Sequence, residues 1–257
     1  MIDPDTFEAG NKDQPKLAGK KSVPCADRRL GGIVTRKERW GFSWYGWLLV
    51  ACVLLLGTAG LVHTIFPFLA VTDRVESDVL VVEGWVPPFA IEAAAREFRS
   101  GAYSVVYTTG GPVGGMGGYT NDYNTLASVG ADHLRAAGLS PKVVQMVPSR
   151  VMERDRTYWA AVALRDWLRE HGGAPAKVNV LTTDAHARRT QFLFQRALGS
   201  QVQVGVISIQ DPDYDPKRWW RSSAGVREVV DETVALIYAK FFFDPGAEEK
   251  PPKRTPL

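Results

Sequence analysis

The sequence predicts an α/β domain with a mostly parallel sheet of about five strands, preceded by one transmembrane helix. Three observations predict this fold class. Apolar, β-branched runs alternate with segments of helical spacing from residue 73 to residue 244, several helical segments end at glycine, and a long charge-free stretch precedes them. Strands that alternate with helices of this length are typical of βαβ units and a parallel sheet. We therefore expect a Rossmann-like three-layer domain over residues 76–243.

Five segments are expected to be strands because each is short, apolar and rich in β-branched residues. In chain order they are residues 78–84, 104–111, 142–147, 177–183 and 201–209. No repeat of fixed period links them. Each crossover between parallel strands is expected to be right-handed, because a right-twisted strand followed by a helix packs back onto its sheet only that way.

The segments between these strands carry apolar residues at intervals of three or four, as one face of a helix requires. Trp159, Ala163 and Trp167, for example, follow one another at four-residue intervals. Helices are expected at residues 89–101, 121–138, 154–173 and 186–199, and a last one is expected to begin near residue 222.

The net charge of +3 is unevenly distributed along the chain. Residues 1–40 contain nine Lys or Arg against six Asp or Glu, whereas residues 41–257 contain twenty-two of each kind. The domain is therefore neutral, which argues against a nucleic acid as its partner. Residues 1–40 and 244–257 are polar and have no apolar period, so we expect a disordered basic tail and a disordered C-terminal tail.

A transmembrane helix is expected at residues 44–68, within a stretch that has no charged side chain. Its length matches the roughly 20 apolar residues that cross a bilayer core. A cleaved signal peptide is the alternative, and the length of the apolar run disfavours it. Basic residues precede the span, so the positive-inside rule places the N-terminus in the cytoplasm and the main domain outside. We interpret the aromatic residues 219–220 and 241–243 as packing residues, with bilayer contact as the alternative.

The carboxyl ends of the predicted strands are where a ligand is expected, because open α/β sheets bind ligands at that edge. Glu83 and Gly84 end the first strand, and Gly110 and Gly111 end the second. Six glycines in residues 110–118 let the backbone approach a ligand closely. Their spacing is neither a dinucleotide fingerprint nor a Walker loop, and a floppy surface loop is the alternative.

The stretch "VLTTDAHARRTQF", residues 180–192, carries the most suggestive chemistry. Thr183 or Asp184 can cap the helix that follows. Arg188 and Arg189 oppose the positive end of that helix unless an anion sits there, held by backbone N–H groups and a guanidinium. His186, with Asp184 two residues earlier, is a candidate general acid or base. The alternative is a plain cap beside a solvated charged face.

A second basic segment, "SRVMERDRTY", places Arg150 before the next helix, with Thr157 as a candidate cap. These residues are interpreted either as further phosphate contacts or as a solvated charge run. With a single histidine at this edge, no metal site is expected. Both cysteines, Cys25 and Cys52, lie outside the domain, so it has neither a disulfide nor thiol chemistry.

Several of these motifs together resemble the YdcF-like family (domain of unknown function 218), which includes envelope proteins of the SanA and ElyC type. The resemblance covers roughly residues 76–243. It rests on Gly110-Gly111, on "RDRTYWAA", on "WWRSSAGVREVVDE" and above all on a Ser/Thr-Asp-x-His-x-x-Arg pattern, matched here by Thr183, Asp184, His186 and Arg189. The family's usual Glu and its Glu-Asn-Ala are replaced here by Val151 and by Trp-Ala-Ala, which leaves catalysis open.

The resemblance implies a bacterial inner-membrane protein of cell-envelope or peptidoglycan biogenesis. We expect its extracytoplasmic domain to bind a phosphorylated or nucleotide-like ligand and to act on lipid-linked phosphate intermediates. In this hypothesis Gly110, Gly111, Arg150 and Arg189 hold the anion, while Asp184 and His186 orient it or transfer a proton. The alternatives are an enzyme that binds S-adenosylmethionine or another nucleotide, and a non-catalytic envelope scaffold.

Overall fold

The computed structural model describes residues 28–29, 34–36, 40–113, 124–150 and 154–247. Its internal contacts divide the chain into two compact units, Met1–Gly57 and Thr58–Leu257. The first unit holds a three-stranded antiparallel sheet of β1 (Arg28–Arg29), β2 (Val34–Arg36) and β3 (Trp40–Phe42). The composition of residues 1–40 had predicted a disordered tail without regular structure. The remainder of the predicted N-terminal tail, like most of the predicted C-terminal tail, lies outside the described residues.

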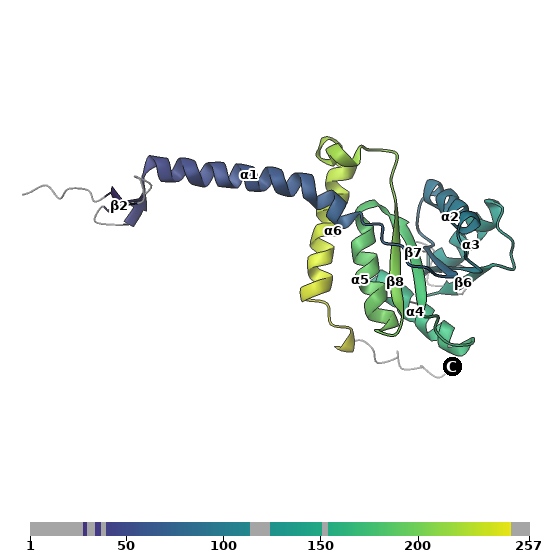
Figure 1. Cartoon of the computed structure of the whole chain (residues 1–257). Coiled ribbons are helices and arrows are strands. Elements are labelled where there is room, and N and C mark those ends of the chain that lie inside the picture. Colours follow the sequence, from purple (N-terminus) through teal and green to yellow (C-terminus); the bar gives the residue numbers. More distant parts are fainter. Residues whose placement is uncertain (1–27, 30–33, 37–39, 114–123, 151–153, 248–257) are drawn as a thin grey trace, which may run out of the picture. The chain divides into compact units, whose positions relative to one another are not determined.

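The second unit is an α/β domain with a five-stranded, all-parallel sheet (Figure 1). Its strand order is β6-β5-β4-β7-β8. The strands are β4 (Val79–Glu83), β5 (Val105–Gly110), β6 (Val144–Pro148), β7 (Lys177–Thr183) and β8 (Gln203–Ile209). The predicted fold class is therefore confirmed. The order reverses between β4 and β7, which is the switch point where open α/β sheets bind ligands.

Helices cover both faces of this sheet. The helices are α2 (Pro88–Ser100), α3 (Leu126–Ala136), α4 (Arg156–Glu170), α5 (Ala187–Leu198) and α6 (Ser223–Phe241). Side chains alternate between the faces along each strand. Val79 and Val81 of β4 join a core with α4, α5 and α6, whereas Leu80 and Val82 join a core with α2 and α3.

Short turns separate some of these elements. A 3₁₀ turn, η1 (Asp184–His186), stands between β7 and α5, where a direct strand-to-helix junction was expected. A second one, η2 (Pro216–Arg221), precedes α6, and η3 (Pro245–Ala247) follows it. The expected helix over residues 121–138 begins only at Leu126, after a Thr125–Ser128 capping box. Residues 114–123 of the glycine-rich segment lie outside the described residues.

Two glycines at the sheet edge have a packing role. A Cβ atom at Gly84 would lie 2.0 Å from the carbonyl oxygen of Leu126, and one at Gly110 would lie 2.6 Å from the Leu126 Cβ. Gly84 also lies against Gly130 of α3. These glycines therefore let α3 approach the ends of β4 and β5 closely, which a larger residue would prevent.

The long apolar helix is α1 (Trp44–Leu69), of 26 residues. At 1.5 Å per residue it is about 39 Å long, and by length and composition it could cross a membrane. A signal sequence would satisfy the same criteria. Its last turns belong to the second unit, where Phe66 and Leu69 are buried together with Trp219 of η2 and Leu236 of α6.

The aromatic residues after β8 divide into two groups. Trp219 and Phe243 are buried, as packing residues should be. Trp220, Phe241 and Phe242 are not buried, and the two phenylalanines are 77% and 73% exposed. The packing interpretation therefore holds for part of the set only.

Candidate functional site

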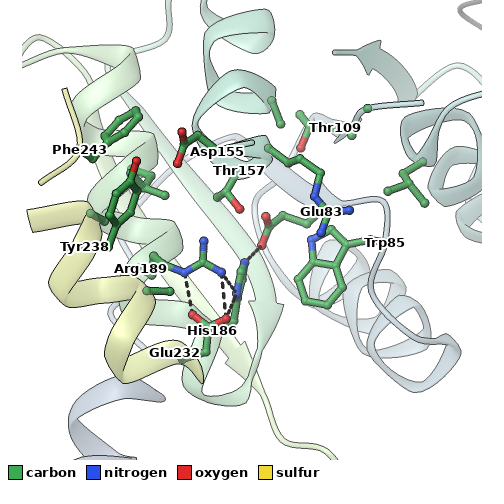
Figure 2. Close-up of a pocket in the computed structure, with 18 of the residues that line it drawn as sticks. Glu83, Trp85, Thr109, Asp155, Thr157, His186, Arg189, Glu232, Tyr238 and Phe243 are labelled. Atoms are coloured by element: carbon green, nitrogen blue, oxygen red, sulfur yellow. Dashed lines mark hydrogen bonds and ion pairs between the residues drawn. The ribbon is translucent and has the colours of Figure 1, made fainter. Parts of the chain in front are cut away.

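A cavity of about 600 Å³ opens at the carboxyl edge of the sheet, next to the switch point. Such a volume accommodates a ligand of nucleotide size, since small-molecule sites span roughly 300–1,000 Å³. Its walls come from the ends of β4 and β5, the start of α4, the η1–α5 junction and α6 (Figure 2). Segments far apart in the sequence thus meet at one place, because parallel strands all end at the same edge.

His186 lies at the centre of the polar wall, where η1 leads into α5. Its side chain is buried, with Nδ1 2.8 Å from Oε1 of Glu232 and Nε2 3.4 Å from Oε2 of Glu83. The ring meets the Trp85 ring edge to face, with centroids 4.9 Å apart. Figure 2 shows the imidazole held between the two carboxylates.

Two carboxylates determine the charge of this histidine. Burial alone would lower the pKa of His186, but the negative charge of Glu83 and the hydrogen bond to Glu232 outweigh it and raise the pKa to about 9. Burial would likewise raise the pKa of Glu232, yet Arg189 and His186 hold it at about 2. At neutral pH the site therefore contains an imidazolium between ionised carboxylates.

Arg189, one turn further along α5, forms a bidentate pair with Glu232. Nε donates to Oε2 at 2.7 Å and Nη2 donates to Oε1 at 2.9 Å. Nη2 is also 2.9 Å from Nδ1 of His186. This last contact is a hydrogen bond only if the imidazole is neutral at Nδ1; with the ring charged, both cations share the Glu232 carboxylate instead.

Glu83, the last residue of β4, is 2% exposed and accepts a hydrogen bond from Oγ1 of Thr190 at 3.0 Å. Burial would raise the pKa of Glu83, but the positive charge of His186 and the hydrogen bonds that Glu83 accepts keep this pKa below its usual value. A buried carboxylate stays ionised only beside such partners. Glu83 and His186 therefore depend on each other for their charge.

The Nε2 atom of His186 has no well-aligned acceptor among the described residues, since its 3.4 Å contact with Glu83 is an ion pair without hydrogen-bond geometry. Oγ1 of Thr109, on the same cavity wall, also lacks a hydrogen-bond partner within the described ranges. Buried polar atoms in native proteins are normally satisfied. His186 and Thr109 therefore bring to the cavity lining two buried polar atoms that have no hydrogen-bond partner among the described residues.

Equal numbers of acidic and basic side chains line the cavity. Glu83, Asp155 and Glu232 oppose Arg156, His186 and Arg189. The start of α4 adds a positive helix end, since its N-cap residue Asp155 and its first two residues, Arg156 and Thr157, all line the cavity. The Asp155 side chain makes no capping hydrogen bond to this helix. An anion would therefore be held by the helix start and Arg156, because Arg189 is already paired.

Six of the residues singled out in the sequence line this cavity: Glu83, Gly110, Gly111, Thr157, His186 and Arg189. Four others do not line it. Gly84 packs on α3, Arg150 is exposed, and Thr183 is buried without a capping hydrogen bond. Asp184 lies on the other side of η1, so it does not share the cavity with His186.

Thr183 and Asp184 were both predicted as possible caps of the helix after β7, and neither side chain caps it. Asp184 instead accepts a hydrogen bond from the backbone N–H of Asp211 at 2.7 Å, and its φ of 34° is left-handed. Its carboxylate lies within 4.8 Å of those of Asp211 and Glu228. Burial, together with the charge of Glu228, raises the pKa of Asp184 to about 7. Three carboxylates at this spacing could hold a cation, although Asp184 and Glu228 already accept hydrogen bonds from the protein.

Glu232 is the main residue of the candidate site that the sequence did not indicate. It lies in α6, 46 residues after His186, and contacts both His186 and Arg189. The available signal was the pair Glu228 and Glu232, which are four residues apart and so lie on one face of the helix. The cavity is also lined by Trp85, Tyr238 and Phe243, and Figure 2 shows Tyr238 and Phe243 on one side of it and Trp85 on the other.

Comparisons with known proteins add no identification. No protein-family model matches the chain, and no curated protein matches it significantly. The fold and the site geometry are therefore the basis for any functional assignment.

Proposed function

We propose that this chain is a membrane-anchored protein of the YdcF-like type, acting in bacterial cell-envelope biogenesis. Its α/β domain binds a phosphorylated ligand at the carboxyl edge of the sheet, and His186 transfers a proton to that ligand. One observation carries the proposal: a buried, protonated imidazole among the residues that line the cavity, whose Nε2 has no aligned acceptor among the described residues.

In this proposal the ligand's phosphate lies at the start of α4. Backbone N–H groups at a helix start bind anions, and Arg156 adds a cation there. Protonated His186 donates from Nε2 to a phosphate oxygen, while Glu83 stabilises the imidazolium. A proton donor with a pKa of about 9 remains charged at neutral pH, which suits a role in holding or protonating an anion.

A lipid-linked phosphate is the substrate class that fits the rest of the cavity. Besides the charged groups, the cavity is lined by apolar side chains, namely Leu126, Ala160, Leu193, Ala235, Ala239 and Phe243. An apolar and a charged wall together suit an amphipathic ligand. An anchored domain also stays close to the surface where lipid headgroups lie, and α1 is long enough to provide that anchor. The membrane setting and the extracytoplasmic orientation are part of this proposal.

The test is binding of a polyprenyl monophosphate or diphosphate to the full chain in detergent, with released phosphate measured in parallel. Binding at 100 times the Kd should stabilise the fold by about 2.7 kcal/mol. His186→Asn should weaken binding at least tenfold, about 1.4 kcal/mol. The exposed His133→Asn, on α3, is the matched control and should bind like the wild type. Equal binding by all three proteins would refute the proposal.

S-adenosylmethionine or another nucleotide is the second candidate ligand. The observation that favours it is the aromatic lining, with Tyr238 and Phe243 on one side and Trp85 on the other, together with the Asp155 carboxylate, which suits a cationic, ring-containing molecule. The same thermal-shift measurement separates the candidates. Stabilisation by S-adenosylmethionine and not by polyprenyl phosphates favours the second, and stabilisation by neither favours the envelope scaffold.

A further inference from the structure

Helix α6 has two apolar faces, and the described residues cover only one of them. Its inner face packs on the domain through Gly225, Val229, Leu236 and Ala239, which are all buried. A second set of apolar side chains follows at spacings of four, four, three and four residues. This outer stripe consists of Val226, Val230, Val234, Ile237 and Phe241, with exposed fractions of 37%, 50%, 62%, 47% and 77%.

The outer stripe begins beside the end of α1, within the same compact unit. The indole Nε1 of Trp219 donates to the carbonyl of Val62 at 3.0 Å, and the Trp220 ring meets His63 with centroids 5.0 Å apart. Ser223 then starts α6 two residues after η2 ends. Figure 1 shows α6 meeting the last turns of α1. The start of α6 therefore lies beside the last two turns of α1, at the domain end of the proposed span.

The residues around the stripe have the composition of a helix that lies in a membrane interface. Trp220 is partly exposed at one end, and Phe241 and Phe242 are exposed at the other. Aromatic residues are enriched at that depth. From η2 to the end of α6, five exposed side chains are basic and one, Asp231, is acidic. The basic ones are Lys217, Arg218, Arg221, Arg227 and Lys240. Such an excess favours anionic lipid headgroups.

We propose that α6 lies on the bilayer surface with its outer stripe in contact with lipid. A second protein would be a poorer occupant, because five side chains of one helix fall far short of the 20–30 residues that each partner contributes to a specific interface. The inference rests on the membrane anchoring in the proposed function. It adds to that function a route for lipid, since Tyr238 of α6 and the adjoining Phe243 line the cavity.

Spin labels on the full chain test this directly. Cys25 and Cys52 are replaced by serine, and the protein is reconstituted into vesicles of phosphatidylethanolamine and phosphatidylglycerol. Single labels are placed at Val234→Cys on the stripe and at Asp231→Cys on the adjacent polar side of α6. Lipid contact makes a label collide more with dissolved oxygen than with a water-soluble nickel chelate. We expect an oxygen preference of several-fold at position 234 and the opposite preference at position 231.

A third label, Leu55→Cys in α1, separates this inference from the proposed anchoring. A lipid signal at position 55 with a water signal at 234 would overturn the inference and leave the anchor intact. A water signal at both positions would overturn the anchor, and the inference with it. A label at 234 that neither reagent reaches would mean that protein covers the stripe, which also overturns the inference. Val230→Asp should shift the label at 234 towards water, whereas His133→Asp, at an exposed position of α3 on the other face of the sheet, should not.

Discussion

Replacing Glu232 by Gln isolates the charge that links α6 to the candidate site. The substitution preserves the shape of the side chain and removes its negative charge. It breaks the bidentate pair with Arg189, at 2.7 and 2.9 Å, and the 2.8 Å contact with His186. Two cations then share a buried site with Glu83 as their nearest carboxylate.

The size of the effect follows from burial. The side chains of Glu232 and Arg189 are 13% and 20% exposed, so the pair is largely shielded from water. Removing one partner of a buried pair costs about 3–5 kcal/mol, and the residual exposure favours the lower end. A loss of about 3 kcal/mol lowers Tm by roughly 6–12 °C for a domain of this size. The pKa of His186 should also fall below its wild-type value of about 9, because one of the two carboxylates that raise it is gone.

Thermal unfolding followed by tryptophan fluorescence, with an NMR titration of the His186 ring, measures both effects on the full chain in detergent. Asp231→Asn changes the neighbouring, exposed carboxylate of the same helix and should stay within about 0.5 kcal/mol of the wild type. The double variant Arg189→Gln/Glu232→Gln should lose less than the two single losses added together, because neither charge is then left alone. Equal Tm values for Glu232→Gln and Asp231→Asn, or a wild-type His186 titrating near 6.5, would refute the reasoning.

Three further predictions concern single positions. The pKa of His186 is about 9 in the folded state and about 6.5 in the unfolded state, so protonated His186 stabilises the fold by roughly 3 kcal/mol below pH 6.5, and this contribution is lost as pH rises through about 9. His186→Asn should therefore flatten the dependence of the urea unfolding midpoint on pH. The pKa of Asp184 is raised to about 7, so stability should fall between about pH 4 and pH 7; Asp184→Asn should raise Tm at pH 8 and not at pH 4, and an unchanged difference across this range would contradict the burial argument. Gly84→Ala places a Cβ 2.0 Å from the Leu126 carbonyl oxygen and should cost at least about 3 kcal/mol, whereas Gly57→Ala meets nothing within 4 Å and should leave Tm unchanged.

The sheet was predictable because its signal is local. Each strand is a short apolar run, and each crossover helix has its own spacing and stop, so the order of elements could be read without knowing any long-range contact. The convergence of Gly110, Gly111, His186 and Arg189 on one cavity was predictable for a related reason. Parallel strands that all end at one edge bring their following residues together whatever their distance in the chain.

The sequence pattern did not predict that residues within 183–189 would contact different parts of the domain. A 3₁₀ turn has three residues per turn, so two residues two positions apart point in widely different directions. Asp184 therefore meets Asp211 while His186 meets Glu83 and Glu232. A sequence motif that places Asp and His two positions apart suggests a catalytic pair, whereas the turn separates them onto opposite sides of η1.

Helix α6 provides the carboxylates that contact the residues of η1 and the start of α5. Glu228 accepts a hydrogen bond from the backbone N–H of Ala185, and Glu232, one helical turn later, binds His186 and Arg189. Val229, between these two carboxylates in sequence, is buried in the cluster that contains the end of α1. The contacts that dock α6 on α1 therefore also set the distance from Glu232 to His186. Since that distance contributes to the charge of the imidazole, we expect a change in the packing of α6 on α1 to shift the pKa of His186 from about 9.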